Sequence, residues 1–137
     1  MQGQDSDIPP HVKAFIASHV GSVVQLETLL MLHGSPAREW EPEEVARDLR
    51  IDRNWAEAQL DALWQQGLVI RTESTTPKRY QYGPAPETKK DVDGLAVAYA
   101  QRRVTVIGLI FAKPADSLRA FSDAFRIRRD KEGDSRG

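Results

Sequence analysis

Apolar side chains recur at helical spacing along the first part of the chain. A double proline precedes VKAFIASHV, and proline is tolerated in the first turn of a helix. Ser22 and Gln25 then form an S-x-x-Q capping box ahead of VVQLETLLMLHG, whose valines and leucines share one face before Gly34. The pattern predicts two helices, one on each side of Gly21.

Two further helices are predicted with a tight turn between them. Pro42 can occupy a first helical position, and the acidic residues that follow it suit the positive end of a helix. After Ile51, Asp52 is a suitable N-cap for a helix over residues 53–66, which Gly67 ends in a left-handed conformation. The apolar face of this helix consists of Ala56, Leu60 and Leu63. Two helices across a short turn form a helix-turn-helix.

Two short runs after this motif have the composition of strands. LVIRT and RYQYG are rich in β-branched and aromatic residues, and the polar segment ESTTPK separates them, which predicts a hairpin. A short strand is also expected at residues 38–40. The order of elements over residues 22–84 resembles the winged helix-turn-helix superfamily. The segments that carry the resemblance are EEVARDL, AQLDALWQQGLVIR and RYQYGP.

The segment KKDVDGLAVAYAQRRVTVIGLIFAKP is predicted to form one long helix. A strand over residues 104–111 is the alternative, because valine, threonine and isoleucine favour strands. Helix is preferred because the preceding GLAVAYAQRR has helical composition and spacing. After Pro114, DSLRAFSDAFRIRR is expected to form a final helix.

These patterns predict a mainly α fold with a small β-hairpin, of the α+β class. A winged helix-turn-helix is followed by a long C-terminal helix and a shorter final helix. We expect a disordered tail over residues 1–9, the winged domain with its N-terminal helix over 10–84, a helical dimerisation extension over 85–130 and a disordered tail over 131–137. A chain of 137 residues suits one domain with such an extension.

Composition narrows the classes of function. The chain has no cysteine, which excludes disulfides, thiolate metal sites and cysteine nucleophiles. The segment MQGQDSDIPP lacks the features of a signal peptide, and the longest apolar run, residues 104–112, is far shorter than the roughly 20 residues of a spanning helix. We therefore expect a cytoplasmic protein without membrane contact. Metal-ligand, nucleophile and phosphate-loop motifs are missing, so we expect no enzyme activity, metal or cofactor.

The resemblance implies a bacterial-type transcriptional regulator that binds double-stranded DNA as a homodimer. In such proteins the second helix of the motif enters the major groove and the wing contacts the backbone. This implies base contacts for the helix over 53–66 and backbone contacts for the wing over 73–79. The residues expected at this interface are Arg53, Asn54, Glu57, Lys78 and Arg79.

The distribution of charge complicates that expectation. Residues 22–84 carry 7 basic and 10 acidic side chains, whereas residues 85–137 carry 11 basic and 8 acidic ones. A DNA-binding module is usually basic where its motif lies. Helical spacing also places Glu57 and Asp61 on the outer face with Asn54. The alternative is therefore a winged-helix module that binds another protein and not DNA.

The long C-terminal helix is apolar on nearly all sides, which a lone helix could not bury. We expect it to form a dimer interface together with the final helix. The expected dimerisation residues are Leu95, Tyr99, Val106, Ile107, Ile110, Phe111, Leu118, Phe121 and Phe125. The alternative is packing within one chain, with residues 95–125 folded back onto the helix at 23–33.

Overall fold

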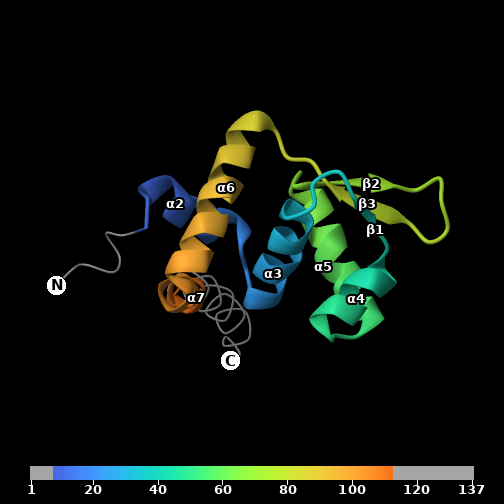
Figure 1. The fold of residues 1–137 in the computed structure, drawn as a ribbon, viewed down its shortest axis with the longest axis horizontal. Coiled ribbons are helices and arrows are strands. Elements are labelled where there is room, and N and C mark those ends of the chain that lie inside the picture. Colours follow the sequence, from blue (N-terminus) through green and yellow to red (C-terminus); the bar gives the residue numbers. More distant parts are fainter. Residues whose placement is uncertain (1–7, 113–137) are drawn as a thin grey trace, which may run out of the picture.

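The computed structural model describes residues 8–112, which form a helical fold with a small sheet (Figure 1). The helices are α2 (Pro10–His19), α3 (Val23–His33), α4 (Pro42–Leu49), α5 (Arg53–Gln65), α6 (Pro86–Gln101) and α7 (Arg103–Ala112). The strands are β1 (Glu39–Trp40), β2 (Val69–Thr72) and β3 (Arg79–Tyr82). The sheet is antiparallel in the order β1-β3-β2. This is a winged helix-turn-helix, so the predicted fold class is confirmed.

Ser22 caps α3 as predicted, but the Gln25 side chain does not complete the capping box on the Ser22 N–H. The Ser22 hydroxyl accepts a hydrogen bond from the Gln25 backbone N–H at 3.1 Å. The Gln25 side chain accepts from the Gly21 N–H at 2.8 Å and donates to the His19 carbonyl at 3.0 Å. Gln25 therefore links α3 to the end of α2, because its side chain pairs with backbone groups of the last α2 residue and of the connecting segment.

The turn between α4 and α5 contains a residue in the left-handed region. Arg50 ends α4 with φ 60° and ψ 48°, and the Ile51 N–H donates to the Ala46 carbonyl at 3.0 Å. Asp52 then caps α5 by accepting from the backbone N–H groups of residues 54 and 55. The predicted helix-turn-helix is thus fixed by a left-handed backbone cap at the end of α4 and a side-chain cap at the start of α5.

Gly67 connects α5 to the wing. Its φ of +78° reverses the chain, as predicted. The Leu68 N–H donates to the Leu63 carbonyl at 2.9 Å, and the Gly67 N–H donates to the Trp64 carbonyl at 3.0 Å. These two bonds form a Schellman motif, which fixes the direction in which β2 leaves the helix.

A single continuous core runs through the molecule. In Figure 1, α2, α6 and α7 lie on one side, α4, α5 and the sheet lie on the other, and α3 lies between them. Leu60 and Leu63 of α5 are fully buried, as are Leu26 and Leu29 of α3. Tyr80 of β3, 1% exposed, closes this part of the core. The α5 face predicted from leucine spacing is therefore the buried face.

The predicted long C-terminal helix divides at Arg102 into α6 and α7, and the chain bends by 117° between them. Helix is confirmed here over the alternative strand. Arg102 leaves the helical region with φ −134° and ψ 52°. A straight helix over residues 86–112 would be about 40 Å long and would carry Val106 and Ile110 away from the core. The bend instead places α7 against α2, where both side chains are buried.

Some sequence expectations fall outside residues 8–112. They include residues 1–7 of the first tail, the final helix with Leu118, Phe121 and Phe125, and the whole second tail. Ile8, which the sequence interpretation assigns to the first tail, is described and only 1% exposed.

Within residues 8–112, no single helix has both the length and the apolar composition to cross a membrane. Two pairs of consecutive helices, α2 with α3 and α6 with α7, reach that length and apolar composition only when the two helices of a pair are taken together, and each pair is sharply bent.

Candidate nucleic-acid interface

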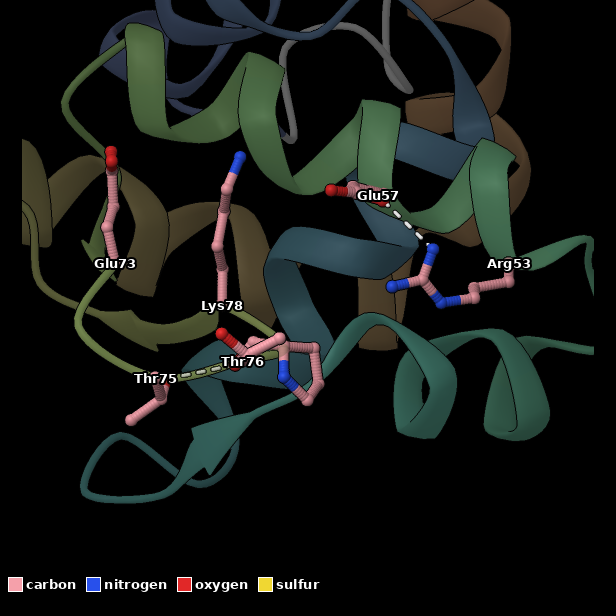
Figure 2. Close-up of a pocket in the computed structure, with 7 residues that line it drawn as sticks. Arg53, Glu57, Glu73, Thr75, Thr76 and Lys78 are labelled. Carbon is pink, nitrogen blue, oxygen red and sulfur yellow. Dashed lines mark hydrogen bonds and ion pairs between the residues drawn. The ribbon is translucent and has the colours of Figure 1, made fainter.

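An open pocket lies between the first turns of α5 and the tip of the wing (Figure 2). Helix α5 supplies Arg53 and Glu57 to its lining. The wing supplies the remaining lining residues, which are Glu73, Thr75, Thr76, Pro77 and Lys78. The pocket therefore brings together three of the residues predicted for DNA contact, Arg53, Glu57 and Lys78.

Arg53 is held between two carboxylates. Its Nη1 donates to Glu57 Oε1 at 3.1 Å, one turn along α5, and its Nε lies 3.8 Å from Glu43 Oε1 on α4. The Arg53 side chain is 43% exposed and that of Glu57 is 28% exposed. Because both ion pairs face solvent, each contributes little to stability and can exchange for another partner.

The two basic residues predicted for the wing have different surroundings. Lys78 lines the pocket, and Figure 2 shows its side chain directed toward α5. Within residues 8–112, Lys78 takes part in no ion pair. Arg79 does not line the pocket, because its guanidinium lies 3.5 Å from Glu39 and 3.6 Å from Glu41 beside β1. Lys78 is therefore the wing cation available to an anion in the pocket.

Asp61 does not lie on a free outer face as the helical spacing predicts, because it joins α5 to the wing. Its Oδ1 accepts from the Tyr80 hydroxyl at 2.6 Å and from Arg71 Nη1 at 3.1 Å. Arg71 also pairs with Glu73, and its guanidinium lies 3.5 Å above the Trp64 ring. The pKa of Tyr80 is raised by burial and by the bond to Asp61. These five residues form the helix–wing network, and Asp61 is oriented toward the wing.

The remaining polar and aromatic candidates, on α5 and on the sheet, differ in exposure. Asn54 is exposed in the first turn, where its backbone N–H is bonded to Asp52. Trp55, next to it, is 48% exposed. Trp40 and Tyr82 are buried in the core, at 3% and 7% exposure. Asn54 and Trp55 are therefore the uncharged side chains of this turn that a partner can reach.

The pocket lining is balanced in charge, with two cations and two carboxylates. It offers guanidinium and ammonium donors, threonine hydroxyls and carboxylate acceptors. Such a lining can bind a polyanion at Arg53 and Lys78, and it can accept hydrogen bonds from amino groups at Glu57. No group of three or more metal-ligating side chains occurs among residues 8–112.

Sequence analysis did not identify Glu43, Arg71 or Glu73 as parts of this region. Alternation along β2 could have indicated that Arg71 lies on the same side as Val69, but its partner Asp61 is ten residues away in sequence. Glu43 was interpreted only as a favourable charge near the start of α4. The Arg53–Glu43 and Arg71–Asp61 contacts join separate elements, so no local spacing reveals them.

The structure separates the predicted dimerisation residues into two groups. Leu95, Val106 and Ile110 are buried within the chain. Tyr99 and Ile107 are partly buried, and the Tyr99 hydroxyl donates to Glu27 at 3.0 Å. Phe111 is 65% exposed, and Val97 and Val104, which were not in the predicted set, are 55% and 82% exposed. Packing within the chain thus accounts for Leu95, Val106 and Ile110, while the exposed apolar side chains can still contact a second chain.

Comparison with known proteins identifies similar folds. No protein-family model matches the sequence, and no curated protein matches it. Among solved structures, MepR, a transcription regulator of the Staphylococcus aureus multidrug efflux pump MepA, is 13% identical with a TM-score of 0.51, over 90% of this chain and 91% of that one. The heme sensor protein PefR from Streptococcus agalactiae is 11% identical with a TM-score of 0.51, over 88% and 84%. At these identities the comparison supports the fold.

Proposed function

We propose that the chain is a DNA-binding transcriptional regulator that acts as a homodimer. The observation that carries the proposal is the pocket between α5 and the wing tip, which presents Arg53 and Lys78 on one open surface. In a winged helix these two elements contact the major groove and the adjacent backbone. The similarity in fold to MepR, a transcription regulator, supports the same function.

The proposed contacts follow from the position of each side chain. Arg53, Asn54 and Glu57 lie in the first turns of α5 and would contact base edges in the major groove. Lys78 would contact a backbone phosphate from the wing tip. Arg79 would contribute there only after it leaves Glu39 and Glu41, so we expect its contribution to be the smaller of the two.

The proposed dimer uses the exposed apolar side chains of α6 and α7. Val104 and Phe111 lie seven residues apart and hence on one face of α7. Large exposed apolar side chains of this kind mark interaction surfaces when they cluster. A two-fold axis through this face would pair two copies of α5, as required to bind two half-sites about 34 Å apart.

DNA binding is tested by anisotropy titration of the full chain with a fluorescent random-sequence duplex, at about 50 and about 200 mM salt. We expect binding that weakens as salt increases. Lys78→Ala should weaken it and should reduce the slope of log affinity against log salt by about one. Lys90→Ala, an exposed lysine of α6 away from the pocket, is the matched control and should leave the slope unchanged. If no duplex binds at the lower salt, the proposed function is wrong.

The dimer is tested by light scattering. The full chain should show twice its mass of 15.4 kDa, and Phe111→Asp should shift it toward the monomer. Lys89→Asp introduces the same side chain at an exposed position near the start of α6 and serves as the control. A full-length chain that remains a monomer at concentrations where DNA binds would refute the dimer and leave DNA binding intact.

A further inference from the structure

We propose that the Arg53–Glu57 pair makes binding selective for a guanine–cytosine base pair in the major groove. The inference rests on the proposed function and specifies which DNA the pocket prefers. It assigns Glu57 a role in base recognition, although its negative charge alone would repel DNA.

The geometry places a donor and an acceptor side by side at the pocket wall. Arg53 is the first residue of α5 and Glu57 is one turn later, so both project from one face of the helix. Their side chains are joined at 3.1 Å and both line the pocket (Figure 2). Lys78 is directed toward them from the wing. A base edge in a major groove that receives the first turns of α5 would meet the two side chains together.

The chemistry of the two groups complements one base pair. Arginine has only donors, and an ionised glutamate has only acceptors. In the major groove guanine presents two acceptors, N7 and O6, and its cytosine partner presents the N4 amino donor beside them. In an adenine–thymine pair the N6 amino donor replaces the guanine O6 acceptor, so the Arg53 fork keeps only N7 on that base. The thymine O4 acceptor and methyl group take the place of the cytosine N4 donor that Glu57 would accept from. The Arg53 fork and the Glu57 carboxylate therefore both find partners on guanine–cytosine.

The ion pair in the free protein increases the selectivity. Before DNA binds, Arg53 and Glu57 satisfy each other. A base edge that engages only one of them leaves the other desolvated without a full set of partners, which is unfavourable. A guanine–cytosine pair provides partners for both Arg53 and Glu57. Another base pair loses a contact and also leaves one of these two charged groups desolvated and unpaired, so it is disfavoured twice.

Glu43 provides an internal comparison. Its carboxylate lies 3.8 Å from the same arginine, but it comes from α4, is 68% exposed and does not line the pocket. It can alter the charge around Arg53 without contacting a base in the pocket. Glu43→Gln and Glu57→Gln thus remove the same charge from the same arginine, and only the second changes the acceptor at the pocket wall.

The experiment selects duplexes from a library with a randomised centre, using the full chain and the two variants. We expect wild-type selections to share a guanine–cytosine pair, whose replacement by adenine–thymine weakens binding by about fivefold or more. Glu57→Gln should move the preference at that position toward adenine, because an amide can pair with adenine N6 and N7. Glu43→Gln should strengthen binding to all sequences by a similar factor and leave the preference unchanged.

The outcomes separate the two proposals. If the wild type retains no duplex, the proposed function fails and this inference fails with it. If duplexes are retained but Glu57→Gln changes affinity equally for every sequence, as Glu43→Gln does, then base selection by Glu57 is overturned while DNA binding stands. Thermal unfolding followed by circular dichroism confirms that both variants are folded. Replacement of the selected guanine by 7-deazaguanine, which lacks the N7 acceptor, should weaken the wild type and have little effect on Arg53→Ala.

Discussion

Strand β3 carries two buried tyrosines, of which one has a hydrogen-bonded hydroxyl and the other does not. The Tyr80 hydroxyl donates to Asp61 at 2.6 Å and belongs to the helix–wing network. The Tyr82 hydroxyl is buried without a hydrogen-bond partner in the described part of the chain, and its ring meets that of His33 edge-on at 5.3 Å. Directional bonds thus fix the wing to α5, whereas Tyr82 joins the sheet to the α3–α6 side by packing. The part of the fold that would contact DNA is the more firmly oriented of the two.

The largest expected effect comes from Asp61→Ala. This change removes the acceptor of the fully buried Tyr80 hydroxyl and one partner of Arg71, whose side chain is only 14% exposed. Because the buried Tyr80 hydroxyl is left without its acceptor, we expect the free energy of unfolding to fall by about 2 to 3 kcal/mol, measured by urea denaturation. Glu43→Ala, which removes a carboxylate that is 68% exposed, should change it by less than about 0.5 kcal/mol. Equal effects of the two variants would contradict the role of the network.

A smaller effect is expected for Tyr80→Phe. Asp61 then loses one donor but keeps Arg71, and the ring continues to fill the core. The free energy of unfolding should fall by about 1 to 1.5 kcal/mol. In a double-mutant cycle with Asp61→Ala the two losses should not add, because both variants remove the same bond. Additive losses would show that the hydroxyl and the carboxylate act separately.

The smallest effect at neutral pH is expected for Tyr82→Phe, because the hydroxyl that it removes has no partner to lose. The free energy of unfolding at pH 7 should change by less than about 0.5 kcal/mol. Burial, and secondarily the charge of Asp93, raises the pKa of Tyr82 to about 12. An unfolded tyrosine titrates near 10, so the folded state holds the proton more tightly.

The raised pKa of Tyr82 gives a pH dependence with a definite sign. The contribution of this hydroxyl to stability is complete below about pH 10 and is lost as the pH rises toward 12. At pH 11 the wild type should have lost about 1 kcal/mol of unfolding free energy that Tyr82→Phe retains. Urea denaturation of both proteins at pH 7, 9 and 11 provides the measurement. Parallel pH profiles would contradict the raised pKa.

The sequence predicts what depends on neighbouring residues. The leucines of α5, the Asp52 cap, Gly67 and the Ser22 side-chain cap each act within a few residues, and the structure confirms all of them. Caps determine where each element begins and ends, and helical spacing determines which face of it is buried, so these features are sufficient to predict a winged helix.

The sequence does not predict what depends on contacts between distant segments. Asp61 finds Tyr80 nineteen residues later, and this long-range contact turns the carboxylate away from the outer face. The bend at Arg102 depends on the fit of α7 against α2, which neither segment shows alone. In the candidate site, the residue types near Arg53 were predicted, but its pairing with Glu43 required the turn between α4 and α5 to be known.

The packing of α2 against α6 and α7 has a consequence for the order in which the chain folds. The winged part contains mostly local contacts, which form early because little loop entropy is lost. Helix α2 exposes Val12, Phe15 and Ile16 until α6 and α7 have been synthesised, and α7 ends about 100 residues after Val12. At ribosomal speeds of about 5 to 20 residues per second, this interval is on the order of 5 to 20 s. During that time the nascent chain presents an unprotected apolar helix, so α2 is open to chaperone binding and to aggregation.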